Sequence, residues 1–242
     1  MTQYVYGKNV VKQLLKSERK IHEILIVEGL KDRELIQQVE HARLPLKRIS
    51  RKKMDILFQN EHHQGVAAKI DEFKSYTLTE VLEAIPAGKQ PLLILLDGIK
   101  DPHNLGAILR SADCVGADGI ILGKHRSVPL NSTVAKVSTG AIDTVKVAYV
   151  SNLSQTLKQL KEQGFWVAAA DAQNAQDYRS ADYHVPLVLV IGSEGEGISP
   201  LVRKMCDYAI ALPMAGSITS LNASVACAVL LYEIYAQRHP LK

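Results

Sequence analysis

Three segments of this sequence carry side chains that could do chemistry, and each follows a short apolar run and leads into a helix-like one. The segments are residues 97–110, 191–197 and 212–222. If the apolar runs are strands of one α/β sheet, all three segments lie at strand carboxyl ends, where ligands usually bind. Together they predict one composite site.

The first segment contains Asn104, where a helix should begin, and Arg110 inside that helix. Asn104 could simply cap the helix. Arg110 is harder to explain as structure, because the residues around it are mostly small and apolar. A guanidinium in such surroundings needs an anionic or hydroxyl partner, so the segment predicts a contact of that kind.

The second segment is a glycine loop that begins at Gly192 and reads Gly-Ser-Glu-Gly-Glu-Gly. Its glycines allow a ligand to lie against main-chain groups. The spacing differs from the G-x-G-x-x-G fingerprint of dinucleotide-binding folds. Glu194 and Glu196 would also repel a pyrophosphate, so the loop suits a cation, a hydroxyl or an ammonium group better.

The third segment begins at Leu212 and ends with Ser220, Leu221 and Asn222, which open the last predicted helix, residues 222–237. Taken alone, this segment is explained more simply by a helix cap at Ser220. Because three such segments occur in one domain, each at a strand end, a shared site explains them better than three separate helix caps.

Short, nearly all-apolar strands alternate with helices from residue 91 onward, which predicts a parallel sheet covered on both faces. The predicted strands are residues 92–96, 119–122, 145–150, 165–170, 187–191 and 208–212. The terminal helix is apolar nearly all round. We therefore expect it to pack in the core and to meet another subunit.

A smaller α/β unit is predicted before residue 73, with three helices alternating with three strands. The helices are residues 7–17, 32–43 and 51–59, and the strands are residues 22–27, 44–49 and 65–70. Residues 71–90 are polar, and an Ala-Gly-Lys-Gln-Pro stretch at 87–91 breaks the chain. These features predict a first domain at 1–72, a linker at 73–90 and a second domain at 91–242.

Positive charge is concentrated in the first third of the chain. Residues 1–74 contain 15 Lys and Arg against 10 Asp and Glu, whereas residues 75–242 contain 14 against 15. This predicts a polyanion-binding module beside a near-neutral one, with a solvated basic face as the alternative. The densest cluster is Lys47, Arg48, Arg51, Lys52 and Lys53.

Export, membrane insertion and metal binding are not expected. The N-terminus lacks a signal-peptide pattern, and no apolar run approaches the length that spans a bilayer. Three scattered cysteines suit neither a disulfide framework nor a thiolate metal site. His62 and His63 have no accompanying ligand set. The expectation is a soluble, cytoplasmic protein without a metal.

The three segments resemble the signature motifs of the SpoU/TrmH branch of the SPOUT RNA methyltransferases. The motifs are N-x-G-x-x-x-R from Asn104, G-S-E-G-x-G from Gly192, and P-M-x-G-x-x-x-S-L-N-x-S from Pro213. Residues 6–11 and 64–68 resemble parts of that family's substrate-binding domain, which is L30e-like. The resemblance covers nearly the whole chain. It implies an α/β fold with a SPOUT-type parallel sheet and a C-terminal trefoil knot, preceded by a small L30e-like α/β domain.

The resemblance also implies a cofactor and a reaction. The cofactor would be S-adenosylmethionine, held by Gly192, Leu212 and Leu221, and its methyl group would pass to a ribose 2'-hydroxyl of RNA gripped by the basic cluster. Arg110 would act on that hydroxyl, as a general base or as a charged orienting group. A guanidinium stays protonated at neutral pH, which favours the second role. The other implied site residues are Asn104, Glu194, Ser220 and Asn222.

The subgroup with the greatest resemblance methylates a guanosine in the peptidyl-transferase region of 23S rRNA, and tRNA is the alternative substrate. The family also implies a homodimer. Two other classes compete with this assignment. A non-catalytic ribosome-assembly factor that binds RNA would show a damaged site, and a nucleotide-dependent oxidoreductase would need a fingerprint loop after its first strand.

Overall fold

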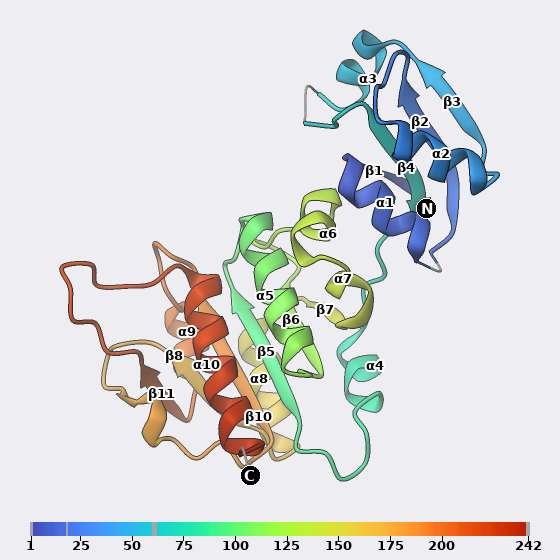
Figure 1. Cartoon of the computed structure of the whole chain (residues 1–242). Helices are drawn as coiled ribbons and strands as arrows, with labels where there is room; N and C mark the ends of the chain where they lie inside the picture. The colour runs from blue at the N-terminus through green and yellow to red at the C-terminus, as the bar shows by residue number, and fades with distance from the viewer. Residues whose placement is uncertain (1, 18, 60–61, 241–242) are drawn as a thin grey trace. The chain divides into compact units, whose positions relative to one another are not determined.

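The computed structural model describes residues 2–17, 19–59 and 62–240, and it divides the chain into two compact units (Figure 1). The first unit comprises Met1–Phe73 with Leu130–Lys136, and the second comprises Lys74–Pro129 with Val137–Lys242. Most of the segment that was expected to be a linker therefore belongs to the second unit. Its helix α4 (Leu78–Glu83) buries Val81 in the core of that unit.

A four-stranded sheet forms the centre of the first unit. Its order is β1 (Thr2–Tyr6), β4 (Val66–Asp71), β2 (Ile21–Val27) and β3 (Leu46–Ile49). β4 runs antiparallel to β1 and β2, while β3 runs parallel to β2. Sequence reasoning missed β1, because only Val5 of its five residues is buried and the strand shows no apolar run.

Three helices complete the first unit, and all three were predicted. They are α1 (Lys8–Lys16), α2 (Arg33–His41) and α3 (Arg51–Leu57). α1 and α2 bury their apolar stripes, such as Val10 and Leu35, as helical spacing requires. α3 buries Met54, which packs with Phe58 against the residues of β2 and β4.

A seven-stranded parallel sheet forms the centre of the second unit. Its spatial order is β7 (Val147–Val150), β6 (Gly119–Gly123), β5 (Leu92–Asp97), β10 (Leu187–Gly192), β8 (Trp166–Ala170), β11 (Tyr208–Ala211) and β9 (Gln176–Asp177). Because every neighbouring pair is parallel, all the carboxyl ends lie along one edge. The six predicted strands are confirmed. β9 was missed because it contains no apolar residue.

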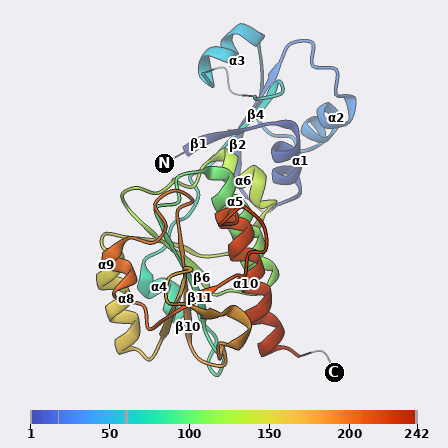
Figure 2. The ribbon, with the colours of Figure 1, turned by 90° about the vertical axis from the view of Figure 1, so that its left-hand side faces the viewer.

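Helices cover both faces of this sheet, as predicted. One face carries α5 (Pro102–Cys114), α7 (Ala141–Thr144) and α10 (Ala223–Arg238), and α5 packs alongside α10 (Figures 1 and 2). The other carries α4, α8 (Leu153–Glu162) and α9 (Pro200–Arg203). The remaining helices are α6 (Ser132–Ser138) and the 3-10 helix η1 (Tyr178–Ser180). The trefoil knot stays a prediction.

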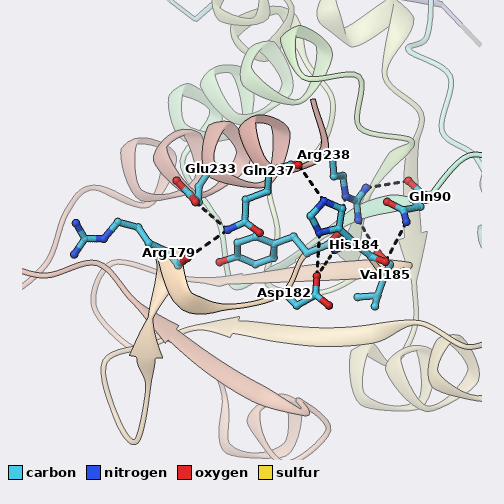
Figure 3. Close-up of polar contacts among 9 residues, drawn as sticks. Gln90, Arg179, Asp182, His184, Val185, Glu233, Gln237 and Arg238 are labelled. Atoms are coloured by element: carbon cyan, nitrogen blue, oxygen red, sulfur yellow. Dashed lines mark hydrogen bonds and ion pairs between the residues drawn. The ribbon is translucent and has the colours of Figure 1, made fainter. Parts of the chain in front are cut away.

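The end of α10 is fastened to the amino-terminal edge of the sheet by Arg238 (Figure 3). Its guanidinium donates hydrogen bonds to main-chain oxygens of Gln90 at 2.9 Å, Tyr183 at 2.9 Å and Val185 at 2.7 Å. Burial lowers the pKa of Arg238 from its usual value. Because α10 is held at this edge, its other end is fixed at the carboxyl edge, where the predicted site lies.

Two further observations concern the described residues alone. None of the helices formed by residues 2–17, 19–59 and 62–240 combines the length and the apolarity that a bilayer crossing requires. Within the same ranges, no three His, Cys, Asp or Glu side chains are grouped so that they could hold a metal ion.

Candidate active site

The three segments with candidate catalytic side chains meet at one edge of the parallel sheet. Residues 97–110 begin at the end of β5, residues 191–197 begin at the end of β10, and residues 212–222 follow β11. β5 and β10 are neighbours, and β8 alone separates β10 from β11. This strand order, which sequence periodicity does not specify, brings distant parts of the chain together.

One side chain from each segment joins a hydrogen-bonded network. Asn104 Nδ2 donates to Glu194 Oε1 at 2.9 Å, and Asn222 Nδ2 donates to Asn104 Oδ1 at 3.0 Å. Asn222 Nδ2 also donates to Glu194 Oε1, as does the main-chain nitrogen of Ala223 at 3.4 Å. Asn104 is buried, whereas Glu194 and Asn222 are exposed. The network is therefore buried at Asn104 and open to solvent at Glu194 and Asn222.

The capping explanation for Asn104 is wrong, because Asp101 caps α5. Asp101 Oδ1 accepts a hydrogen bond from the main-chain nitrogen of His103 at 2.9 Å. The cap of α10 is Asn222, not Ser220, since Asn222 Oδ1 accepts from the main-chain nitrogen of Ser224 at 3.0 Å. Asn104 thus does not cap α5. Its side-chain amide forms hydrogen bonds with Glu194 and Asn222, which belong to the other two segments.

The glycine loop turns back on itself directly after β10. Ser193 and Gly197 exchange main-chain hydrogen bonds of 3.1 and 2.9 Å, which closes the loop. A Cβ atom on Gly192 would lie 2.2 Å from the carbonyl carbon of Gly197. Glycine is required at this position because the backbone of the returning loop occupies the space of any side chain. Gly195 is different, since a Cβ there would meet nothing within 4 Å.

A cleft of about 600 Å³ opens beside this loop. It is lined by the three residues that were assigned to the cofactor, Gly192, Leu212 and Leu221, and by two of the other implied site residues, Glu194 and Ser220. The acidic side chains that line the cleft belong to Asp171, Glu194 and Glu196, and no Lys or Arg of the described chain lines it. The cleft therefore has a mixed polar and apolar lining with acidic side chains, and no basic side chain of the described residues is there to pair with a phosphate.

Sequence reasoning missed one wall of the cleft, which begins with Asp171 at the end of β8. Arg203 of α9 forms an ion pair with Asp171 and donates to the main-chain oxygen of Gln173 at 2.7 Å. The signal was available. Residues 165–170 were predicted as a strand, and the polar residue after it lies at the same sheet edge as the other three segments.

Of the predicted catalytic residues, Asn104, Asn222 and Arg110 do not line the cleft, and Arg110 also lies outside the network of Asn104, Glu194 and Asn222. Arg110 is exposed near the end of α5. It is also absent from a smaller hollow of about 280 Å³ that Asn104 and Glu194 border. No carboxylate among the described residues forms an ion pair with it. Its guanidinium is free to meet a partner outside this chain.

The predicted basic cluster of the first unit is exposed, but two of its members are already paired. Lys47 forms an ion pair with Glu23, which lowers the pKa of Glu23 from its usual value, and Arg48 pairs with Glu40 at 3.4 Å. The other three, Arg51, Lys52 and Lys53, open α3 and pair with no carboxylate of the described chain. They are the better candidates for an external anion.

His62 and His63, predicted as loop histidines, have different surroundings. His62 is exposed, whereas His63 is buried and its Nε2 lies 2.7 Å from Asp55 Oδ1 of α3. His63 Nδ1 accepts a hydrogen bond from the main-chain nitrogen of Gly65 at 2.9 Å. His63 therefore ties the loop before β4 to α3.

This fold and this site define an α/β enzyme that holds a small, phosphate-free cofactor at the carboxyl ends of its strands. The chain belongs to the SpoU rRNA methylase family, whose model matches residues 91–232. Residues 4–76 match a second model, described as RNA 2'-O ribose methyltransferase substrate binding.

Relatives and solved structures agree with this membership. A Bacillus subtilis protein, YacO, named for the TrmH family of tRNA/rRNA methyltransferases, is 45% identical over 98% of this chain and 97% of its own. The SpoU methyltransferase AviRb of Streptomyces viridochromogenes, solved with S-adenosylmethionine, is 25% identical with a TM-score of 0.81, covering 100% of this chain and 92% of its own. An rRNA methyltransferase of Sinorhizobium meliloti, also solved with that cofactor, shares the fold, with 23% identity, a TM-score of 0.75 and coverage of 100% and 88%.

S-adenosylmethionine is the cofactor of this family, and the cleft fits it. Its volume lies within the range of about 300–1,000 Å³ that small-molecule sites occupy. The cofactor carries a sulfonium and an ammonium but no phosphate, which agrees with the exposed carboxylates of Glu194 and Glu196 and with a lining that has no Lys or Arg among the described residues. The close approach of the returning backbone at Gly192 keeps any side chain out of this part of the loop.

Proposed function

We propose that this RNA methyltransferase acts on the ribose 2'-hydroxyl of a guanosine in the peptidyl-transferase region of 23S rRNA. The observation that carries the catalytic part is the Asn104–Glu194–Asn222 network, which is complete and lies beside the cofactor cleft. A non-catalytic assembly factor would have no need to keep it. The substrate-binding match supports an RNA ribose as the target.

We assign the cofactor to Gly192, Leu212 and Leu221, which line the cleft. S-adenosylmethionine supplies the methyl group. The target ribose is assigned to the smaller hollow at Asn104, which shares the stretch 193–196 with the cleft, so that both reactants lie on either side of one loop. Holding two reactants in this way lowers the activation free energy by several kcal/mol.

Glu194 and the two asparagines would orient the ribose, with Ser220 on the cofactor side. Glu194 Oε1 already accepts from both asparagine side chains, while Glu194 itself stays exposed to an incoming hydroxyl. Arg110 is assigned a charged role at the 2'-oxygen and a neighbouring phosphate. A protonated guanidinium can donate to both groups, which a neutral base could not.

A homodimer is part of the proposal. α10 leaves Val225, Val229, Tyr232 and Tyr235 exposed at 38–53% of their surface, and an apolar stripe of this kind suits a second copy of the chain. Light scattering should give a mass near twice 26.6 kDa. A monomer at micromolar concentration would contradict it. We place the enzyme in the cytoplasm, with its RNA.

A tRNA ribose is the second candidate substrate, because the name of the Bacillus subtilis relative includes both tRNA and rRNA. Total RNA from a deletion strain, incubated with the purified protein and labelled S-adenosylmethionine, separates the two. We expect one new alkali-resistant linkage, at a 23S guanosine. A linkage confined to tRNA would replace the rRNA assignment, and no linkage in either RNA would contradict the enzymatic one.

Changing Arg51, Lys52 and Lys53 together to Ser should weaken RNA binding about tenfold or more at low salt. Each lost phosphate contact should also flatten the dependence of log K on log salt by roughly 0.7–0.9. Lys16, Lys31 and Arg33 are the matched control, since they are exposed in the same unit and form no ion pair with a described residue. Equal losses in both triple variants would remove the cluster from the RNA interface.

A further inference from the structure

A second set of basic side chains lies in the catalytic unit, on the loop that follows β6. Lys124, His125 and Arg126 are consecutive and exposed. No described carboxylate forms an ion pair with any of them. The unpaired charges of Lys124 and Arg126 either bind a polyanion or remain solvated, and the position of the loop distinguishes the two.

Hydrogen bonds hold this loop to both neighbouring strands. The main-chain nitrogen of Lys124 donates to Val150 at the end of β7, at 2.8 Å, and that of Val128 donates to Ile99 beyond β5, at 3.0 Å. Tyr149 Oη donates to the main-chain oxygen of Val128 at 3.0 Å. The backbone is therefore fixed while the three basic side chains stay free.

Arg126 adopts a left-handed backbone conformation, with φ of 61°. This conformation costs a non-glycine residue of order 1 kcal/mol or more. Ser127 Oγ donates to the main-chain oxygen of Gly123, which closes the turn around Arg126. The turn thus fixes the main chain at Arg126 in spite of a local energetic cost.

The loop lies between two hollows at the carboxyl edge. On one side Ile99, which accepts its hydrogen bond, lines the hollow at Asn104 assigned above to the target ribose. On the other side Lys124 itself lines a separate hollow of about 520 Å³, formed by the start of α4, the end of β7 and the start of α8.

This second hollow is polar and short of negative charge. Its lining includes Gln155 and Gln159, whose amide groups can donate and accept hydrogen bonds. Its one acidic lining residue is Glu80, which already accepts from the main-chain nitrogen of Thr77 at 2.7 Å in a capping box. The hollow therefore offers amides and a lysine, and its one carboxylate among the described residues is held by the start of α4.

We propose that Lys124 and Arg126 bind phosphates next to the target nucleotide, and that the adjoining polar hollow takes a flanking nucleotide of the same RNA strand. The proposal rests on the proposed function, because it places the target ribose at Asn104. Because β6 lies between β5 and β7, the ends of these two strands are two inter-strand spacings apart, about 10 Å. About three stacked nucleotides cover this distance. RNA recognition of this kind targets unpaired bases through amide hydrogen bonds and aromatic or cationic contacts.

The test compares Lys124→Ser/Arg126→Ser with the control Lys204→Ser, which removes an exposed charge just after α9, in the same unit and outside the lining of both hollows. Methylation kinetics on the RNA substrate, S-adenosylmethionine affinity and salt dependence are measured. We expect the KM for RNA to rise about tenfold and the salt slope to fall by about 1–2, with cofactor affinity unchanged. The control should match the wild type.

A second variant, Gln155→Glu/Gln159→Glu, places carboxylates in the hollow without removing any cation. We expect it to raise the KM for RNA while the melting temperature stays that of the wild type. If both double variants keep the wild-type KM for RNA while the wild type methylates normally, the loop is only solvated and this inference fails. A wild type that methylates no RNA would instead contradict the proposed function.

Discussion

Replacing Gly192 by alanine is expected to abolish S-adenosylmethionine binding and to lower the stability of the second unit. The added Cβ would lie 2.2 Å from the carbonyl carbon of Gly197, 2.4 Å from the nitrogen of Ile198 and 2.5 Å from the oxygen of Gly197. These atoms are backbone, so no side chain can move aside. The segment from Gly197 to Ile198 must shift, and the two main-chain hydrogen bonds between Ser193 and Gly197 are then lost or distorted.

Such a change has two consequences. Overpacking that forces backbone shifts typically costs about 1–3 kcal/mol of stability, which should lower the melting temperature by several degrees. The cofactor cleft is lined by the same loop from Gly192 to Gly197, so its shape changes with the backbone. Isothermal titration with S-adenosylmethionine should then detect no binding, and methylation should fall below detection.

Gly195→Ala is the matched control. Gly195 belongs to the same loop and lines the same cleft, but its Cβ would meet nothing within 4 Å and its φ is not positive. The melting temperature of this variant should lie near that of the wild type, and the cofactor should still bind. If Gly192→Ala bound S-adenosylmethionine as tightly as Gly195→Ala, the cleft would not be the cofactor site.

The sequence predicts the elements of this fold better than their arrangement. Apolar runs locate the six longer strands of the second sheet, because strands buried on both faces have little choice of residue. The position of β10 between β5 and β8 follows from the packing of the whole chain. The bond between Asn104 and Asn222, 118 residues apart, depends on that order and could not be derived from local pattern.

Helix caps illustrate the same limit at short range. Asp101 and Asn104 are both good capping residues near the start of α5, and Ser220 and Asn222 are both good ones near the start of α10. The structure uses Asp101 and Asn222. Choosing between two such residues requires the exact end of the preceding turn, and boundaries are the least certain part of any prediction from sequence.

Arg110→Ala is expected to lower the rate of methylation by about 10²–10³ while it leaves S-adenosylmethionine affinity unchanged. Removing one group that stabilises charge in a transition state commonly has an effect of this size. The cofactor should bind normally because Arg110 is exposed and lines neither the cleft nor the hollow at Asn104. Single-turnover methylation and calorimetric titration measure the two quantities. Loss of cofactor binding in this variant would move Arg110 into the cofactor site and contradict the assignment.

Arg110→Lys and the pH profile distinguish the two possible roles of this residue. Lysine keeps the positive charge but loses the planar set of donors, so a charged orienting group should be partly rescued by it. The dependence of the rate on pH should then have the same shape in the wild type and in Arg110→Ala, since a protonated guanidinium contributes no titration near neutrality. A general base requires the opposite pattern, in which the rise of the rate with pH disappears in Arg110→Ala. Because a guanidinium is not deprotonated in proteins near neutral pH, we expect the shapes to agree and the lysine variant to retain part of the activity.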